Sequence, residues 1–147
     1  MPFDKVLNLN VCNYSTAPNS PITLAGFIIG PINTNFGSYP NGLLIQMISC
    51  NISCNNSINF NLFVRTTNAS SSETVLGGTT GNLCWPLFCS GGASGAYVYK
   101  SNDNRFKRVT LPVTADNIVI TITPDSTATQ ESISSIGGAM LIRLVGF

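Results

Sequence analysis

Five cysteines are the side chains of this 147-residue sequence with the most specific chemistry available to them: Cys12, Cys50, Cys54, Cys84 and Cys89. Two pairs are close in sequence, with the spacings C-x3-C and C-x4-C. Thiolates can bind zinc, thiols can stay as small buried side chains, and two thiols can form a disulfide. The bulky residues inside the two spacings, such as Ile52 and Trp85, do not suit a tight zinc knuckle. We therefore favour disulfides over zinc and over inert thiols.

Spacing alone leaves the disulfide pairing open. If the chain from Cys50 to Cys54 were extended, the two residues would lie roughly 13 Å apart, beyond the reach of a disulfide. Either residues 51–53 form a tight turn, or each cysteine bonds elsewhere, for example across to Cys84 and Cys89. One of the five cysteines is left over in both cases. Because an odd cysteine suggests a bond between chains, we expect Cys12 to cross-link subunits.

Catalytic constellations are missing from the sequence. It contains no histidine, which excludes Ser-His-Asp and Cys-His catalysis and histidine-containing metal triads. Its six acidic residues are spread thinly: Asp4, Glu73, Asp103, Asp116, Asp125 and Glu131. Asp116 and Asp125 stand at opposite ends of one predicted strand, so they suit turns better than a glycosidase pair. We expect no enzymatic activity, no cofactor and no metal.

Three aromatic residues, Trp85, Tyr97 and Tyr99, could contact a glycan. The two tyrosines share one face of a predicted strand, because alternate residues of a strand point the same way. The alternative is ordinary packing, since Trp85 is followed by the apolar residues 86–88 and suits a core plug beneath a loop.

The composition points to a folded domain with an uncharged surface. Apolar residues make up 44 % of the chain and charged residues only 9 %, against roughly a quarter in an average domain. Residues 6–64 contain no charged side chain. A net charge of +1 gives no electrostatic case for nucleic acid or anionic membrane, and polar residues interrupt every apolar run too often for a membrane span. The basic cluster at 105–108, beside Lys100, is expected to be a solvated hairpin end.

Apolar residues recur mainly with a period of two, which indicates β-strands. Strands are predicted over residues 7–11, 22–29, 43–49, 57–65, 96–100, 109–113, 118–122 and 138–147. Loops are predicted over residues 30–42, 66–73 and 124–135, and an irregular segment of unknown role over 77–95. We infer an all-β, single-domain, two-sheet sandwich of jelly-roll or Greek-key type over residues 16–147, with an extended N-terminal arm over residues 1–15.

Two features of this arrangement suggest assembly. The arm presents Leu7, Leu9 and Val11 in the alternation that a strand needs to join a neighbour's sheet edge. On the strand predicted at 57–65, Asn59, Asn61 and Phe63 face away from the apolar side and form a candidate assembly face. A lysine placed at either asparagine should hinder assembly without disturbing the fold.

The arm from Val6 to Tyr14 with its Cys12, together with the Thr-, Ser- and Asn-rich composition, resembles the small jelly-roll subunits of bacterial endospore appendages. The resemblance implies a self-assembling structural subunit whose arm cysteine bridges to neighbouring copies. This sequence departs from that pattern in having one arm cysteine and an additional Cys84-to-Cys89 segment. The expected partners are therefore copies of the same chain, in a filament or a shell.

Two alternatives remain open. A virion protein, such as a capsid, decoration or fibre protein, fits the same features, and a carbohydrate-binding adhesion module would use the three aromatic residues. The N-terminus shows no basic region followed by an apolar region, so we expect synthesis in the cytoplasm without a signal peptide. The expected final location is an extracellular surface structure or a virion.

Overall fold

The computed structural model of the chain describes residues 2–10, 25–56, 62–71, 82–90, 96–124 and 133–147. These ranges contain nine strands and one short helix. In chain order they are β1 (Phe3–Asn10), β2 (Ala25–Ile29), α1 (Ile32–Asn35), β3 (Leu43–Asn56), β4 (Leu62–Ser70), β5 (Asn82–Ser90), β6 (Ala96–Lys100), β7 (Lys107–Val109), β8 (Ile118–Pro124) and β9 (Ile133–Gly146).

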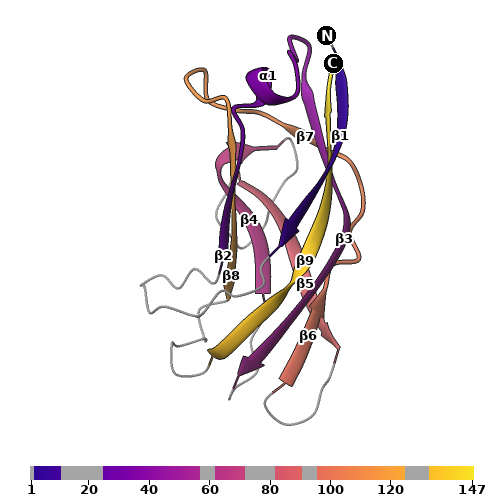
Figure 1. Cartoon of the computed structure of the whole chain (residues 1–147), viewed down its shortest axis with the longest axis vertical. Helices are drawn as coiled ribbons and strands as arrows, with labels where there is room; N and C mark the ends of the chain where they lie inside the picture. The colour runs from indigo at the N-terminus through magenta and orange to yellow at the C-terminus, as the bar shows by residue number, and fades with distance from the viewer. Residues whose placement is uncertain (1, 11–24, 57–61, 72–81, 91–95, 125–132) are drawn as a thin grey trace.

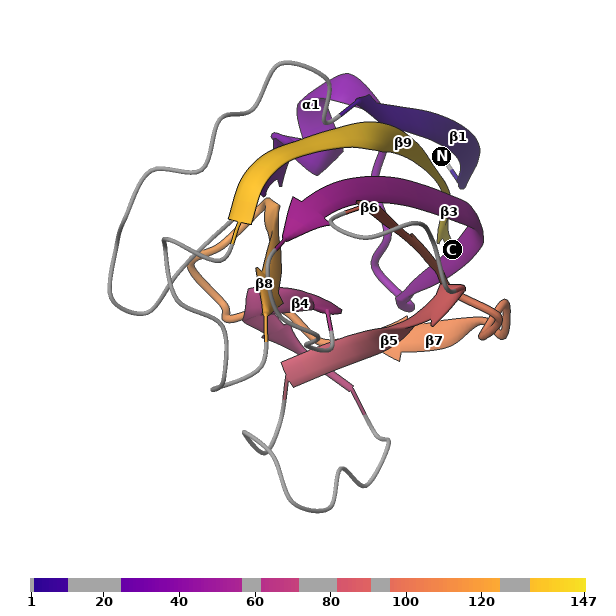
Figure 2. The ribbon, with the colours of Figure 1, turned by 90° about the horizontal axis from the view of Figure 1, so that it is seen from below.

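The strands follow one continuous order, β1-β9-β3-β6-β5-β4-β8-β2, and β7 pairs with β3 beside this path. All of these pairings are antiparallel. Because β5 pairs with both β4 and β6, the path is a single sheet, which curls until it nearly closes into a barrel (Figure 1, Figure 2). The all-β prediction is confirmed. In the described residues β1 and β2 stand at the two ends of the strand order.

The core is built by the period-two alternation seen in the sequence, because successive residues of a strand point to opposite faces. The buried side chains include Leu62 and Val64 on β4, Ile118, Ile120 and Ile122 on β8, and Met140, Ile142 and Leu144 on β9. Trp85 and Tyr99 have the largest of the fully buried side chains. They fill the interior from β5 and β6.

An extra residue bends β3 and lets it run beyond its predicted end at Ser49. Met47 is buried, Ile48 and Ser49 are both exposed, and Cys50 is buried again. The register with β9 shifts between Met47 and Ser49, as expected for a β-bulge. The bulge returns the alternation to the core face, and the strand continues to Asn56.

The loop predicted over residues 66–73 is wrong in its first part, because β4 continues to Ser70. Polar side chains support this extension. The Asn68 amide donates a hydrogen bond to the Asn117 carbonyl oxygen at 2.9 Å and accepts one from the Val119 N–H at 3.0 Å. These bonds join β4 to β8 through a polar side chain, so hydrophobic periodicity does not detect them.

The irregular segment predicted over residues 77–95 is also corrected, because β5 occupies its middle. Trp85 and Leu87 are buried, whereas Phe88 is exposed, so the strand alternation is present. Pro86 is half-buried between them, but a proline without an N–H argues against a central strand when only the sequence is known.

Two smaller elements differ from the expectation. The strand predicted over residues 109–113 is replaced by the three-residue β7, after which Thr110 pairs with Ser70 in an isolated bridge. Helix α1 lies within the loop predicted over residues 30–42. Within the described ranges, no helix has the length and apolar character needed to cross a membrane.

Candidate assembly surface

The N-terminal strand β1 lies along β9 of its own chain, and each of its eight residues has a register partner there. The predicted arm residues Leu7 and Leu9 are half-buried and pack against the core. Val11 and the rest of the predicted arm, to residue 15, lie outside the described residues. The described part of the arm is therefore an end strand of the sheet, with one apolar face turned inward.

Phe3, the first residue of β1, packs this end of the strand against the rest of the chain. Its side chain is buried, with its ring centre 5.9 Å from that of Phe36 and 6.4 Å from that of Tyr39, the latter in an edge-on arrangement. Directly opposite Phe3 on β9 stands Gly146, where a Cβ atom would overlap the Phe3 ring. We call Phe36, Tyr39 and Gly146 the Phe3 socket, because together they leave space for one ring and contact it.

Tyr39, one of the residues of this socket, is hydrogen-bonded to Asp116. The Tyr39 hydroxyl donates a hydrogen bond to Asp116 Oδ1 at 2.8 Å. The same carboxylate accepts bonds from the backbone N–H and the side-chain amide of Asn33. Burial, together with the hydrogen bond to Asp116, raises the pKa of Tyr39 to about 12. The hydroxyl therefore stays protonated, and can donate to Asp116, across the physiological range.

An ion pair joins β1 to β9 beside the socket. Arg143 on β9 donates from Nε to Asp4 Oδ1 at 2.8 Å, and its Nη2 contacts Asp4 Oδ2. The hydrogen bond from Arg143 lowers the pKa of Asp4, and the same bond raises the pKa of Arg143. The guanidinium also lies 5.4 Å from the ring centre of Phe106. Such two-point pairing adds geometric selectivity to the attraction.

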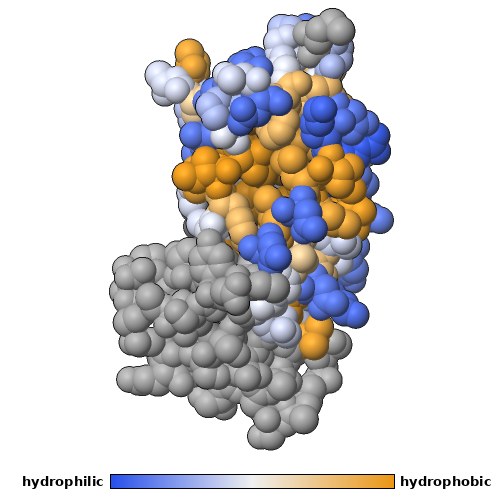
Figure 3. All heavy atoms as spheres, in the orientation of Figure 1, coloured by the Kyte–Doolittle hydropathy of each residue, from blue (hydrophilic) through white to orange (hydrophobic). Residues whose placement is uncertain are grey.

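Apolar side chains gather in a band across the middle of the face that carries β1 and β2 (Figure 3). Among the exposed large apolar residues are Val6 on β1, Ile28 on β2 and Ile48 on β3, with 59 %, 71 % and 43 % of their surface accessible. Phe27 on β2 is half-buried against the core. Both end strands of the sheet thus carry apolar side chains at the surface.

A shallow hollow of about 610 Å³ lies beside this band, over the outer face of β1, β9 and β3. It is lined by Asn8, Asn10, Ser49, Asn51, Ser53, Gly138, Ala139 and Leu141. Amides and hydroxyls surround small residues, and the lining contains no charged side chain. Such a surface can accept hydrogen bonds from an uncharged partner without desolvating an ion.

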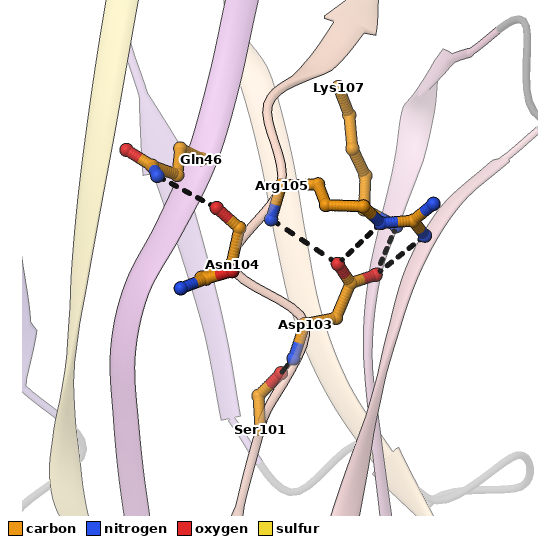
Figure 4. A network of polar contacts seen from close by, with 6 residues as sticks. All are labelled: Gln46, Ser101, Asp103, Asn104, Arg105 and Lys107. Carbon is orange, nitrogen blue, oxygen red and sulfur yellow. Dashed lines mark hydrogen bonds and ion pairs between the residues drawn. The ribbon is translucent and has the colours of Figure 1, made fainter.

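The basic residues predicted to form a solvated hairpin end are split between surface and core. Figure 4 shows two of them, Arg105 and Lys107, on the same Asp103 carboxylate. Lys107 is buried: its Nζ lies 3.0 Å from Asp103 Oδ2 and 5.4 Å from the ring centre of Trp85. Arg105 is exposed and binds the same carboxylate through Nε at 3.0 Å. The hydrogen bond from Arg105, with a further one from Lys107, holds the pKa of Asp103 well below its usual range. Through Asp103 and Lys107, the cluster connects the loop before β7 to the core.

Cys50 is a free thiol in the core, so its assignment as a disulfide or cross-link cysteine is wrong for this structure. The bulge in β3 turns its side chain inward, opposite the buried Met140. Burial raises the pKa of the Cys50 thiol to about 12. A thiol that stays protonated is a poor nucleophile.

The other four cysteines are only partly placed. Cys12 lies outside the described residues, as do the side chains of Cys54, Cys84 and Cys89. Their backbones put Cys54 in β3 with Cys50, and Cys84 in β5 with Cys89. At roughly 3.3 Å per residue, the members of each close pair are too far apart for a disulfide. Among the described residues, no group of three or more His, Cys, Asp or Glu side chains comes together.

Two of the three predicted glycan contacts are contradicted. Trp85 and Tyr99 are 0 % and 1 % exposed, and a ring without an exposed face cannot stack on a sugar. The side chain of Tyr97 lies outside the described residues. The alternative interpretation, in which Trp85 fills the core, agrees with its burial.

The candidate assembly face on β4 is described only at Phe63, because Asn59 and Asn61 lie outside the described residues. Phe63 is half-buried on the face opposite the buried Leu62, as the alternation predicts. The guanidinium of Arg65 lies 4.6 Å from the Phe63 ring centre, so a cation covers part of this ring.

Sequence reasoning missed the anchor of β1, formed by Phe3, Asp4, Arg143 and Gly146. Phe3 lies on the same face of β1 as Leu7 and Leu9, but Lys5 interrupts the apolar alternation between them, so the pattern did not extend to Phe3. Comparisons of the chain with family models, with curated proteins and with solved structures found no match. The functional interpretation therefore depends on the geometry of this surface alone.

Proposed function

We propose that this protein is a structural subunit that self-assembles into a filament or a shell through its end strands and uncharged surfaces. The supporting observation is that both end strands expose large apolar side chains, Val6 on β1 and Ile28 on β2. Exposed apolar patches are a common mark of contact sites. Covering such a patch with another copy is favourable by about 25 cal/mol per Å² of apolar area.

The low charge of the surrounding surface supports the same proposal. Soluble proteins usually protect the end strands of a sheet with lysine, proline or another charge. β2 has the sequence AGFII and carries no proline and no charged residue. The hollow over β1, β9 and β3 has an uncharged lining. A second copy can approach these surfaces without removing ions from water, which is the main cost of burying a charged contact.

The symmetry of the assembly distinguishes the two forms that we propose. A contact between two different surfaces runs on as a filament if the rotation does not close, and forms a closed object if it does. A filament fits an extracellular appendage or fibre, and a closed shell fits a virion. In the filament, Cys12 is the candidate for a covalent bond between neighbours.

Negative-stain electron microscopy of the purified chain, with and without reductant, tests the proposal together with light scattering. Ordered filaments or shells are the expected result, and their symmetry identifies the form. Loss of order on reduction would assign the cysteines to cross-links. A monodisperse monomer under both conditions would overturn the proposal and turn attention to glycan binding.

A single-charge variant tests whether the end strand β2 makes the contact. We expect Ile28→Lys to prevent assembly, because the ammonium must be desolvated in any interface that covers β2. Val113→Lys is the matched control, since Val113 is fully exposed outside the strands. Ile28→Lys should remain small in light scattering while Val113→Lys behaves as wild type. Equal assembly of both variants would place the contact elsewhere.

A further inference from the structure

We propose that β1 is exchanged between copies, so that β1 of one copy lies on β9 of the next, with Phe3 in the neighbour's socket and Asp4 on the neighbour's Arg143. This inference rests on the proposed function and names the segment that carries the connection. In the assembly, the β9 edge of each copy is thus occupied by β1 of a neighbouring copy, in the place that its own β1 takes within the single chain.

The position of β1 makes the exchange possible without new contacts. In the described residues β1 stands at the end of the strand order and its only strand partner is β9. Its departure separates no other pair of strands, and every copy offers the same β9 edge. An exchanged element of this kind makes the contacts it makes in the monomer, so the cost of forming a dimer or polymer is low.

The length of the chain after β1 is sufficient for this exchange. Fourteen residues, 11–24, separate β1 from β2. Fully extended, they span up to roughly 46 Å at 3.3 Å per residue, whereas β1 itself is about 26 Å long. The covalent connection therefore does not confine β1 to its own sheet.

The register of β1 on β9 is specified strongly enough to select one docking position. Asp4 is the single acidic residue of β1, and Arg143 is the single charged residue of β9. The ring of Phe3 needs the glycine at 146, because a Cβ there would overlap it. A slip by two residues in either direction would move Phe3 away from Gly146, and in one of the two directions it would also carry Asp4 farther from Arg143. A strand that arrives from another copy needs this selectivity, because its loop does not set the register.

Charge reversal tests the exchange. In Asp4→Arg copies, arginine meets arginine within one chain, and in Arg143→Asp copies, aspartate meets aspartate. When the two variants are mixed, β1 of each is complementary to β9 of the other, so only exchange between chains restores the pair. We expect each variant alone to lose most of the light-scattering signal and an equimolar mixture to recover it. The double variant, which restores the pair in every copy, should assemble as wild type.

Cross-linking gives a second measurement that does not depend on the strength of one ion pair. Asn8 and Leu141 are register partners on β1 and β9, with the Asn8 side chain exposed and that of Leu141 partly exposed. Copies with Asn8→Cys, mixed with copies carrying Leu141→Cys, can join these positions only between chains. A disulfide-linked pair of the two chains is expected on oxidation, above the level obtained when Asn8→Cys copies are mixed with wild type.

The results separate this inference from the proposed function. If wild type assembles but neither the mixture nor the cross-link responds, β1 pairs only within its own chain and the exchange is overturned, while self-assembly stands. If wild type stays monomeric, the proposed function is overturned. Circular dichroism is the control for folding: both charge variants should keep the spectrum of a folded β-sheet protein.

Discussion

Lys107 is the residue at which charge and burial conflict most directly in the described part of the chain. It stands opposite Ile45 in the pairing of β7 with β3, so the strand alternation carries its ammonium into the core. An isolated buried charge is very costly. Here Asp103 supplies a counter-charge and the face of Trp85 a further attraction. The basic residue is thus part of the core structure rather than of a ligand site.

The two members of this buried pair should respond differently to substitution. Asp103→Asn leaves the ammonium buried without a counter-charge, and we expect a loss of about 3 kcal/mol in the free energy of unfolding. Lys107→Met replaces the ammonium with an apolar side chain of similar volume. Asp103 keeps Arg105 as its partner, so the change should stay within about 1 kcal/mol. Urea denaturation at neutral pH measures both. A larger loss for Lys107→Met than for Asp103→Asn would contradict the stabilising role proposed for Asp103 beside the buried Lys107.

The pH dependence of the same pair follows from the direction of the Asp103 shift. Its pKa is lower in the folded than in the unfolded chain, so the folded state favours the ionised form. The stabilisation is complete above the unfolded pKa, near 4, and is lost as the pH falls through the folded value. Wild type should therefore lose more stability between neutral and acidic pH than Asp103→Asn, which lacks this carboxylate.

At the scale of elements, β4 shows how polar residues extend a strand. Asn68 donates to Asn117 and accepts from the Val119 N–H, and these bonds join the second half of β4 to β8. Asn68→Ala would leave backbone groups of both residues without their partner, at a cost of about 2 kcal/mol. Thr67→Ala, at the exposed neighbouring position, is the control. Thermal unfolding should show a clear decrease for the first variant and little change for the second.

The elements that the sequence predicts well are those whose alternation is purely apolar. Ile118, Ile120 and Ile122 are buried as expected, because β-branched residues at a period of two have one stable arrangement in a half-buried strand. The errors fall where a residue argues against a strand or where polar bonds replace apolar contacts. Pro86 argues against a strand at β5, and the hydrogen bonds of the Asn68 amide extend β4.

The candidate assembly surface was only half predictable. The end strand was indicated by Leu7 and Leu9, but its anchor depends on Gly146, which meets Phe3 across almost the full length of the chain. Local patterns carry no information about such a pairing. The strand order is hidden for the same reason, since the longest pairing in the sheet joins β3 to β9, two elements with five other strands between them in sequence.

At the scale of the whole molecule, a single sheet that nearly closes leaves two end strands on one apolar face (Figure 3). A closed barrel has no edges and gives a self-contained monomer. This chain stops short of closure, and one of its end strands, β2, carries no charged side chain. The same arrangement that leaves the sheet open thus provides the surface on which copies can meet.

The temperature dependence of assembly tests this view of the whole molecule. If apolar area on the end strands drives association, binding carries a negative heat-capacity change and weakens on cooling. We expect light scattering of the wild-type assembly to fall reversibly in the cold and to recover at room temperature. Val113→Lys should follow the same curve, because its charge lies away from the end strands. Assembly that strengthens on cooling would instead indicate that hydrogen bonds or ion pairs dominate the contact, and that the apolar band is not its centre.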